Sequence, residues 1–128
     1  MWWMNDDEGS GTALGVGITA AVAVVATVVI FAASFLICKA HVRSDAEQTA
    51  LAAAQYLQLA LHDKSRTYAD ACAVARGNAH HMYTKLESCT IHGENVDVSM
   101  SAQPSISILP RVQIKTRAGP VECVPRNR

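Results

Sequence analysis

The sequence predicts an α+β fold: a long amino-terminal helix, first in a membrane and then in water, followed by a second helix and about three antiparallel strands. Three observations predict it. No Asp, Glu, Lys, Arg or His occurs between Glu8 and Lys39, residues 39–61 contain neither Pro nor Gly, and apolar and polar residues alternate from Ser88 onward. The first pattern indicates a membrane span, the second a continued helix and the third β-strands.

The apolar run is long enough to cross a bilayer. As a helix, the 27 residues from 12 to 38 would span about 40 Å, against about 30 Å of bilayer hydrocarbon. A soluble domain would have to cover such a helix on every side, and the rest of the chain is too short for that. We therefore predict a transmembrane helix over 12–38, after a short acidic leader, 1–11. A secretory signal peptide is disfavoured, because its apolar segment is only about 7–15 residues long and follows a basic leader.

The helix is predicted to continue beyond the membrane to about Leu61, giving a helical extension and break over 39–66. Small apolar residues recur there at intervals of three and four, which places them on one helix face. Because this stripe is rich in Ala, a neighbour can approach it closely. That neighbour is either a helix of another protein or this chain's own domain. The stripe consists of Ala46, Ala50, Ala53, Leu57 and Leu61.

A small α+β domain is predicted over 67–120, ahead of a basic tail at 121–128. Its helix is expected from about Tyr68 to Leu86, where apolar residues again recur at helical spacing. Ser65 or Thr67 is the predicted N-cap, because a hydroxyl oxygen there can accept a hydrogen bond from the first turn.

The rest of the domain is predicted to form about three antiparallel strands. Residues 88–102 alternate around a Gly-containing four-residue turn at 92–95, which indicates a hairpin. Residues 106–116 also alternate, and Pro110 within them marks a bend or an edge position.

Two cysteines are placed where a disulfide can form. Cys72 is expected on the second helix and Cys89 at the start of the next strand, and a turn of this length can bring their Cα atoms within the roughly 5.5–6 Å that a disulfide requires. Outside the cytoplasm the pair should be oxidised, whereas in a reducing cytosol it stays as two ordinary thiols. Cys123 lies on the tail and is not expected to substitute. Cys38 ends the membrane run, where a small buried apolar role is expected.

No pattern typical of a catalytic or metal site occurs in the sequence. His80 and His81 are adjacent, so on a helix they point about 100° apart and cannot bind one ion as an i, i+4 pair does. There is no Gly-x-Ser-x-Gly motif, no phosphate-binding loop and no two closely spaced pairs of cysteines. We therefore predict a protein that is not an enzyme and has no cofactor, metal or small-molecule substrate. A net charge of zero gives no reason to expect nucleic acid.

Several short motifs occur in a fixed order over residues 6–120. They are Asp7-Glu8-Gly9-Ser10 with Thr12-Ala13, then Thr49 to Ala54, Ala71-Cys72-Ala73, Leu86 to Cys89, and Lys115 to Pro120. Together they resemble the TadE-like proteins of actinobacteria, which are encoded near tight-adherence (Flp) pilus and secretion genes. The resemblance implies a pseudopilin-like, non-enzymatic minor pilin or assembly component. Its implied partners are membrane lipid and other pilin-like or secretion-machinery membrane proteins.

The resemblance also implies features of the membrane segment. If a leader is removed, cleavage is expected after Gly9, with Gly11 as the second choice. Gly11 and Gly15 also have the small-residue spacing at which two membrane helices can contact each other.

The side of the membrane on which the domain lies is open at this stage. The resemblance implies a single-pass protein of the cell membrane with its carboxy-terminal domain outside the cytoplasm. Lys39 and Arg43 point the other way, because the positive-inside rule favours a cytoplasmic location for the segment that carries them. The alternative function is therefore a single-pass scaffold or regulatory subunit with a cytoplasmic carboxy-terminal domain.

Overall fold

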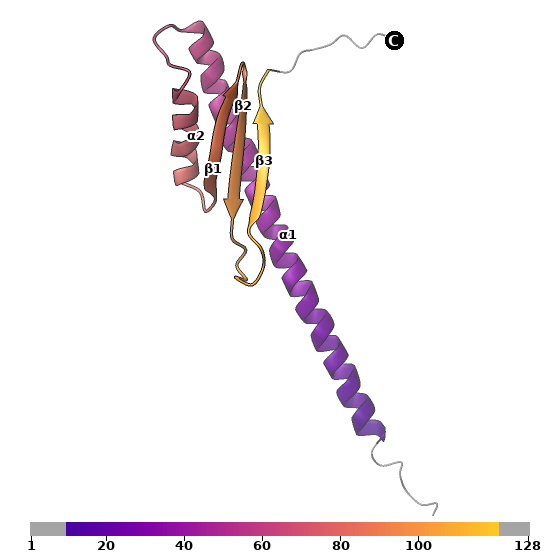
Figure 1. The fold of residues 1–128 in the computed structure, drawn as a ribbon. Helices are drawn as coiled ribbons and strands as arrows, with labels where there is room; N and C mark the ends of the chain where they lie inside the picture. Colours follow the sequence, from indigo (N-terminus) through magenta and orange to yellow (C-terminus); the bar gives the residue numbers. More distant parts are fainter. Residues whose placement is uncertain (1–9, 121–128) are drawn as a thin grey trace, which may run out of the picture.

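A computed structural model describes residues 10–120 and has the predicted α+β class (Figure 1). Its elements, in chain order, are α1 (Ser10–His62), α2 (Asp70–His80), β1 (Lys85–His92), β2 (Asn95–Ala102) and β3 (Val112–Ala118). The predicted cleavage residue Gly9, the predicted tail 121–128 and Cys123 within it lie outside the described residues.

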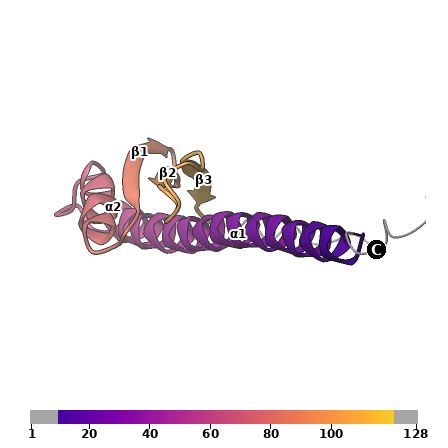
Figure 2. The same ribbon diagram turned by 90° about the horizontal axis from the view of Figure 1, so that it is seen from below.

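The long helix α1 runs without interruption for 53 residues, as the absence of Pro and the apolar run predicted. Its first part protrudes from the molecule, and its last part lies against α2 and the sheet (Figures 1 and 2). At the helical rise its length is about 80 Å. One helix is therefore long enough both to cross a bilayer and to support the domain.

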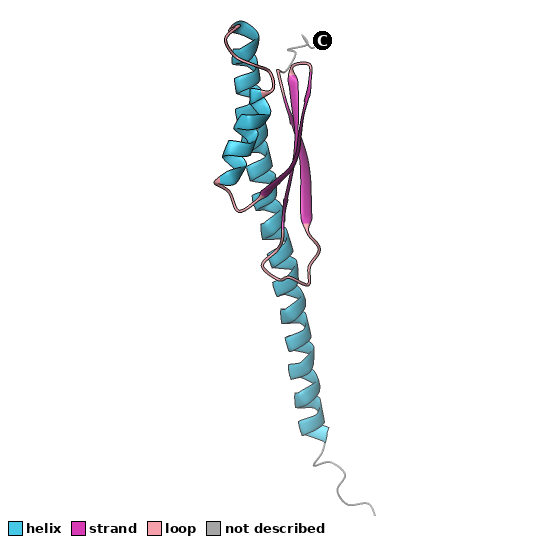
Figure 3. Cartoon of the chain, turned by 60° about the vertical axis from the view of Figure 1, so that its left-hand side comes forward, coloured by secondary structure: helices cyan, strands magenta, loops and turns pink. Residues whose placement is uncertain are grey.

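The three strands form one antiparallel sheet in the order β1-β2-β3, seen from the side in Figure 3. The turn between β1 and β2 is tighter than predicted, since His92 and Asn95 already pair with each other and only Gly93 and Glu94 connect them. Gly93 has φ 62°, a left-handed conformation that glycine adopts without steric cost. This residue therefore permits the hairpin.

The core lies between the sheet and the two helices. Contacts join α1 to α2, β2 and β3, and α2 to β1. Alternate residues of β2 face the helices, as the period of two in a strand requires, and small Ala residues on both helices let the backbones approach closely. The largest fully buried apolar side chains are Leu57, Met100, Val42, Val96 and Val98.

The second helix is shorter than predicted. It ends at His80 rather than Leu86, and Leu86 belongs to β1. Its N-cap residue is Ala69, which makes no side-chain capping hydrogen bond, so the expectation of a cap at Ser65 or Thr67 is wrong. The apolar periodicity runs on past the helix because the next residues enter the same core from a strand.

The third strand is also shorter than predicted. It begins at Val112, and residues 103–111 form a loop instead of the first half of an alternating strand. Pro104 and Pro110 lie in this loop, and neither has the N–H that a ladder would need. The alternation of Ile106 and Ile108 was therefore not a strand signal.

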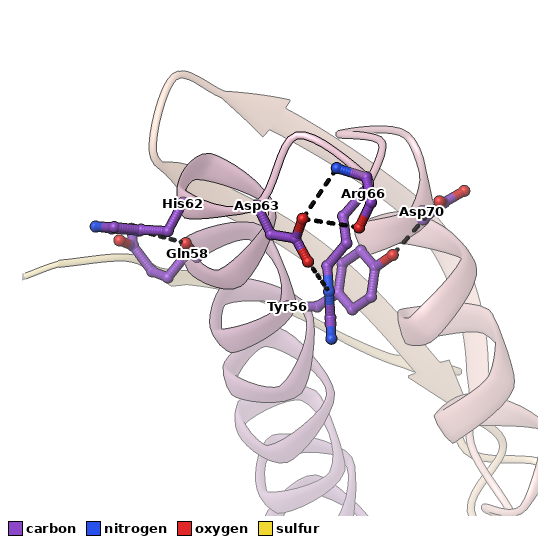
Figure 4. Close-up of polar contacts among 7 residues, drawn as sticks. Tyr56, Gln58, His62, Asp63, Arg66 and Asp70 are labelled. Atoms are coloured by element: carbon purple, nitrogen blue, oxygen red, sulfur yellow. Dashed lines mark hydrogen bonds and ion pairs between the residues drawn. The ribbon is translucent and has the colours of Figure 1, made fainter.

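Polar contacts hold the turn that reverses the chain between α1 and α2 (Figure 4). Asp63 accepts hydrogen bonds from the backbone N–H of Ser65 at 3.0 Å and from its hydroxyl at 2.7 Å. The Arg66 guanidinium lies 5.4 Å from the ring centroid of Tyr56, and the Tyr56 hydroxyl donates to Asp70 at 3.4 Å. These contacts join α1 to the start of α2, so that α2 folds back along α1.

Candidate functional site

The candidate functional surface is the first part of α1, which no other described residue covers. Every residue from 11 to 30 is exposed, with Leu14 at 68% and Val24 at 63%. At the helical rise these 20 residues span about 30 Å, which equals the hydrocarbon thickness of a bilayer. Within residues 10–120, α1 is the one helix long and apolar enough to cross a membrane, and none of its apolar window is buried. We call residues 11–30 the uncovered segment.

Two hydroxyl groups in the uncovered segment, those of Thr19 and Thr27, are satisfied by the helix itself. Thr19 donates to the carbonyl oxygens of Gly15 at 2.6 Å and Val16 at 3.1 Å, and Thr27 donates to that of Ala23 at 2.8 Å. Hydrocarbon offers no partner to a polar group, so such internal bonds are the arrangement that a lipid-exposed Thr requires.

The glycine pair predicted to contact another membrane helix lies on this surface. Gly11 and Gly15 are both exposed, and a Cβ added at either would meet no atom within 4 Å. Gly11, the second choice for leader cleavage, lies in the first turn of α1. Both roles of these residues stay predictions.

The Ala-rich stripe is covered by the chain's own domain. Ala46, Ala50, Ala53 and Leu57 are all 0% exposed and belong to the core between α2 and the sheet, whereas Leu61 at its end is exposed. Of the two neighbours considered from the sequence, it is this chain's own domain that fills the position. The stripe is therefore not the surface that meets a helix of another protein.

Cys72 of α2 and Cys89 of β1 form a disulfide, with their Cα atoms 5.8 Å apart. Cys89 lies in the middle of β1 rather than at its start. The bond joins α2 to the strand that packs against it. Closing a loop of this length stabilises a domain by about 3 kcal/mol in the chain-entropy model.

A β-bulge in β1 turns Cys89 toward α2. The pairing register with β2 shifts between Leu86 and Ser88, so Glu87 is an extra residue in the strand. In a regular strand, Leu86 and Cys89 would face opposite sides of the sheet, because they are three residues apart. The bulge places both on the helix-facing side. The bulge was not predicted from the sequence, although the core-facing residues are spaced by three from Leu86 to Cys89 and by two from Cys89 to Ile91.

Glu87 itself is held on the outer face of the sheet. Its carboxylate accepts a hydrogen bond from the hydroxyl of Ser101 at 2.5 Å and lies 3.6 Å from Nη1 of Arg111. The hydrogen bond from Ser101 is the main cause of a lowered pKa for Glu87. The bulge residue thus ties β1 to β2 and to the start of β3.

Two further pairs of polar side chains join β2 to β3 on the outer face. Arg117 donates to both carboxylate oxygens of Asp97, at 2.6 and 2.8 Å, and this contact lowers the pKa of Asp97. Gln113 donates through Nε2 to the hydroxyl of Ser99 at 2.8 Å. These are structural contacts between neighbouring strands, and they do not form an arrangement of nucleophile and base.

A hollow of about 640 Å³ lies where α1 leaves the uncovered segment and meets the domain. Cys38, a half-buried free thiol, lines it together with His41, Asp45 and His81. Thr84 donates to Asp45 at 2.9 Å. Within residues 10–120, no group of three or more His, Cys, Asp or Glu side chains is arranged to hold a metal ion.

The described residues thus bring together an uncovered apolar helix segment, a domain closed by a disulfide and a polar sheet face with several paired side chains. No family model, curated protein or solved structure matches the chain. The function proposed below therefore rests on the sequence motifs and on the geometry of the described residues.

Proposed function

We propose that this chain is a TadE-like minor pilin or pilus- and secretion-assembly component, held in the cell membrane by the uncovered segment and carrying its small domain outside the cytoplasm. One observation carries the proposal. A single helix is exposed at every residue from 11 to 30 and fully buried at Ala46, Ala50 and Ala53 further along. A water-soluble protein does not leave so large an apolar surface uncovered, and hydrocarbon is the solvent that suits it.

The disulfide supports the location of the domain. A bond between Cys72 and Cys89 persists in an oxidising compartment and is reduced in the cytosol. Lys39 and Arg43 argue for the opposite orientation, but so few charges bias topology only modestly. The bond therefore favours an extracytoplasmic domain.

The exposed surfaces support a role in assembly. The sheet and α2 already occupy the Ala-rich stripe, so the uncovered segment with its Gly11–Gly15 pair is the surface left for other membrane helices. A non-enzymatic component that assembles with other membrane helices fits these features best.

Anchoring is tested by placing charges in the uncovered segment. The Val24→Arg/Val25→Asp double substitution costs about 5–7 kcal/mol on the insertion scale, and the variant should appear in the soluble fraction after carbonate extraction. The matched Val24→Leu/Val25→Leu variant should stay in the membrane. Carbonate-resistant association of the charged variant would contradict the proposed anchor.

Participation in a pilus is tested in cells that carry the pilus genes. Deletion of the chain should reduce surface filaments, and mass spectrometry should detect the chain in sheared filaments or in the membrane assembly complex. The same spectra report processing, for which cleavage after Gly9 is expected and a Gly9→Leu variant should keep Met1. Normal filaments in the deletion strain would contradict the pilin role if the chain is also absent from the sheared filaments and from the membrane assembly complex of the parent strain.

The second candidate is a single-pass scaffold or regulatory subunit with a cytoplasmic domain. The specific observation that favours it is the pair Lys39 and Arg43 immediately after the apolar run. A topology reporter fused after Arg128 separates the two candidates, because it is active on only one side of the membrane.

A further inference from the structure

We propose that the loop between β2 and β3, residues 103–111, is a second membrane contact that inserts into the interfacial layer of the bilayer crossed by α1. The inference rests on the proposed membrane anchor and adds a lipid-binding surface to the domain. The loop lies at the end of the sheet that faces the protruding part of α1 (Figures 1 and 3). A lipid surface is therefore what this end of the domain meets first.

Leu109 places the loop against the apolar helix. Together with residues of α1 it lines an apolar hollow of about 570 Å³. Phe31 is the first residue of α1 after the uncovered segment that is not fully exposed, and Phe35 packs against the edge of the core. The domain therefore begins to cover α1 at the level of this loop. The other residues that line the hollow are Thr27, Val28, Phe31, Ala32 and Phe35.

The position of the loop accounts for the length of the apolar run. The run of 27 residues exceeds the hydrocarbon thickness by about 10 Å, whereas the uncovered segment matches it. If residues 11–30 fill the hydrocarbon, residues 31–35 rise about 7 Å through the interfacial layer, which is itself about 5–7 Å thick on each side. Leu109 of the loop lies beside α1 between Thr27 and Phe35, so the loop falls at the boundary between the hydrocarbon and the interfacial layer.

The tip of the loop has the side chains that an interface favours. Ile108 is 84% exposed, which is more than Leu51 and Leu59, at 55% each, on the open face of α1. Ile106 and Leu109 on either side are half-buried. Burial of an Ile side chain in the interface would remove this exposed apolar area from water, which is favourable.

Several backbone groups of the loop already have hydrogen-bond partners, as the water-poor interfacial layer requires. The side-chain amide of Gln103 donates to the carbonyl oxygens of Leu109 at 2.7 Å and Ser107 at 3.4 Å. The N–H of Leu109 donates to the carbonyl of Ile106 at 3.0 Å. The loop therefore presents apolar side chains while several of its backbone groups are already paired.

Two amphipathic side chains lie near the ends of the loop. Arg111, the last residue of the loop, is exposed, so its guanidinium can reach lipid phosphate while remaining near Glu87. Tyr83, 107% exposed, lies on the connection between α2 and β1 and lines the hollow where α1 enters the domain. Tyr and Arg are typical of the membrane–water boundary. These residues define the rim of the proposed contact.

Tryptophan fluorescence measures the depth of the loop directly. In a Trp2→Phe/Trp3→Phe background, the full-length Ile108→Trp variant is reconstituted into phosphatidylcholine–phosphatidylglycerol vesicles with and without acyl-chain-brominated lipid. Emission should shift to the blue and be quenched by the brominated lipid. Tyr68→Trp in the same background is the control, because the exposed turn after α1 lies at the far end of the domain, and it should not be quenched.

Flotation of the vesicles separates failure of the loop proposal from failure of the anchor. Protein that floats with the vesicles while the Ile108→Trp variant stays unquenched would overturn the loop contact and leave the anchor standing. Equal quenching of the Tyr68→Trp variant would also overturn it, because the whole domain would then lie on the lipid. Protein that does not float would overturn both proposals. A blue shift of the Ile108→Trp variant without bromine quenching would mean that protein covers position 108 instead of lipid, and it would likewise overturn the loop contact.

Discussion

At the scale of single residues, two glycines have opposite roles. A Cβ on Gly119 would overlap the side-chain amide of Asn95 and approach its Cα to 3.1 Å, whereas a Cβ on Gly77 would meet nothing within 4 Å. The amide of Asn95 can rotate away, but its backbone is fixed by pairing with β1. Gly119 is therefore required for close approach, and Gly77 within α2 only weakens the helix.

We expect the Gly119→Ala variant to lower the free energy of unfolding by about 1–3 kcal/mol, because overpacking forces the strand ends apart. The matched Gly77→Ala variant should raise it by about 0.5–1 kcal/mol, because alanine is the better helix former. Chemical denaturation in detergent measures both. A Gly119→Ala variant as stable as the wild type would contradict the close contact with Asn95.

The paired carboxylates make stability depend on pH. Hydrogen bonds from Ser65 lower the pKa of Asp63, and those from Arg117 lower the pKa of Asp97. A folded pKa below the unfolded value gives stability that is present above about pH 4 and is lost as pH falls through the folded pKa. The melting temperature should therefore be level near neutral pH and fall in acid.

The Asp97→Asn variant isolates one of these contributions. It should melt below the wild type at pH 7, and the difference should shrink as pH falls below about 4, since the wild-type carboxylate is then protonated as well. Melting curves from pH 3 to 7 at low salt give the comparison. A difference independent of pH would show that the ion pair with Arg117 does not stabilise the fold.

At the scale of elements, α1 has two parts that meet different surroundings. Its second part supplies the stripe on which α2 and the sheet pack, and only one face of that part is covered. Leu57 is 0% exposed, while Leu59, two residues further on, is 55% exposed. The stability of the domain should therefore depend on one face of α1 and not on the other.

Two substitutions on the same turn of α1 test this difference. Leu57→Ala should lower the free energy of unfolding by about 2–5 kcal/mol, the range for large-to-small changes in a core. Leu59→Ala should change it by less than about 1 kcal/mol, as surface changes do. Similar losses from both would mean that a second surface covers Leu59.

The sequence was sufficient for elements with a long periodic signal. The uncharged run and the absence of Pro predicted the whole of α1, and the alternation around Gly93 predicted the hairpin. The end of α2 was misplaced because Leu86 continues the apolar periodicity from a strand. An Ala stripe looks the same whether it meets its own sheet or a foreign helix, so its neighbour was undecided until the fold was known.

Two features of the candidate site had no signal strong enough to predict them. The bulge at Glu87 depends on how β1 pairs with β2, which local propensity does not encode. The loop at 103–111 was interpreted as part of a strand, because Ile106 and Ile108 alternate. Leu109 of this loop lines the same hollow as Phe31, which is far away in the sequence. Their proximity depends on how the sheet packs along α1, so local sequence patterns do not predict it.

At the scale of the whole molecule, one helix has a part that suits hydrocarbon and a part that suits water. The uncovered segment fits hydrocarbon, and the domain beyond it is a water-facing unit whose α2 and β1 are joined by the disulfide. The disulfide reports on which side of the membrane that unit lies, because the bond persists only away from the reducing cytosol. The redox state of these two cysteines therefore bears both on the orientation of the protein and on the choice between the pilin and the scaffold.

The redox state of Cys72 and Cys89 in intact cells tests this account most directly. Cells are acid-quenched, thiols are alkylated with one reagent before reduction and a second after it, and the peptides are mapped by mass spectrometry. The account predicts that both cysteines carry only the second label, while Cys38, a free thiol, carries the first. First-reagent labelling of both Cys72 and Cys89 would contradict it and favour the cytoplasmic scaffold.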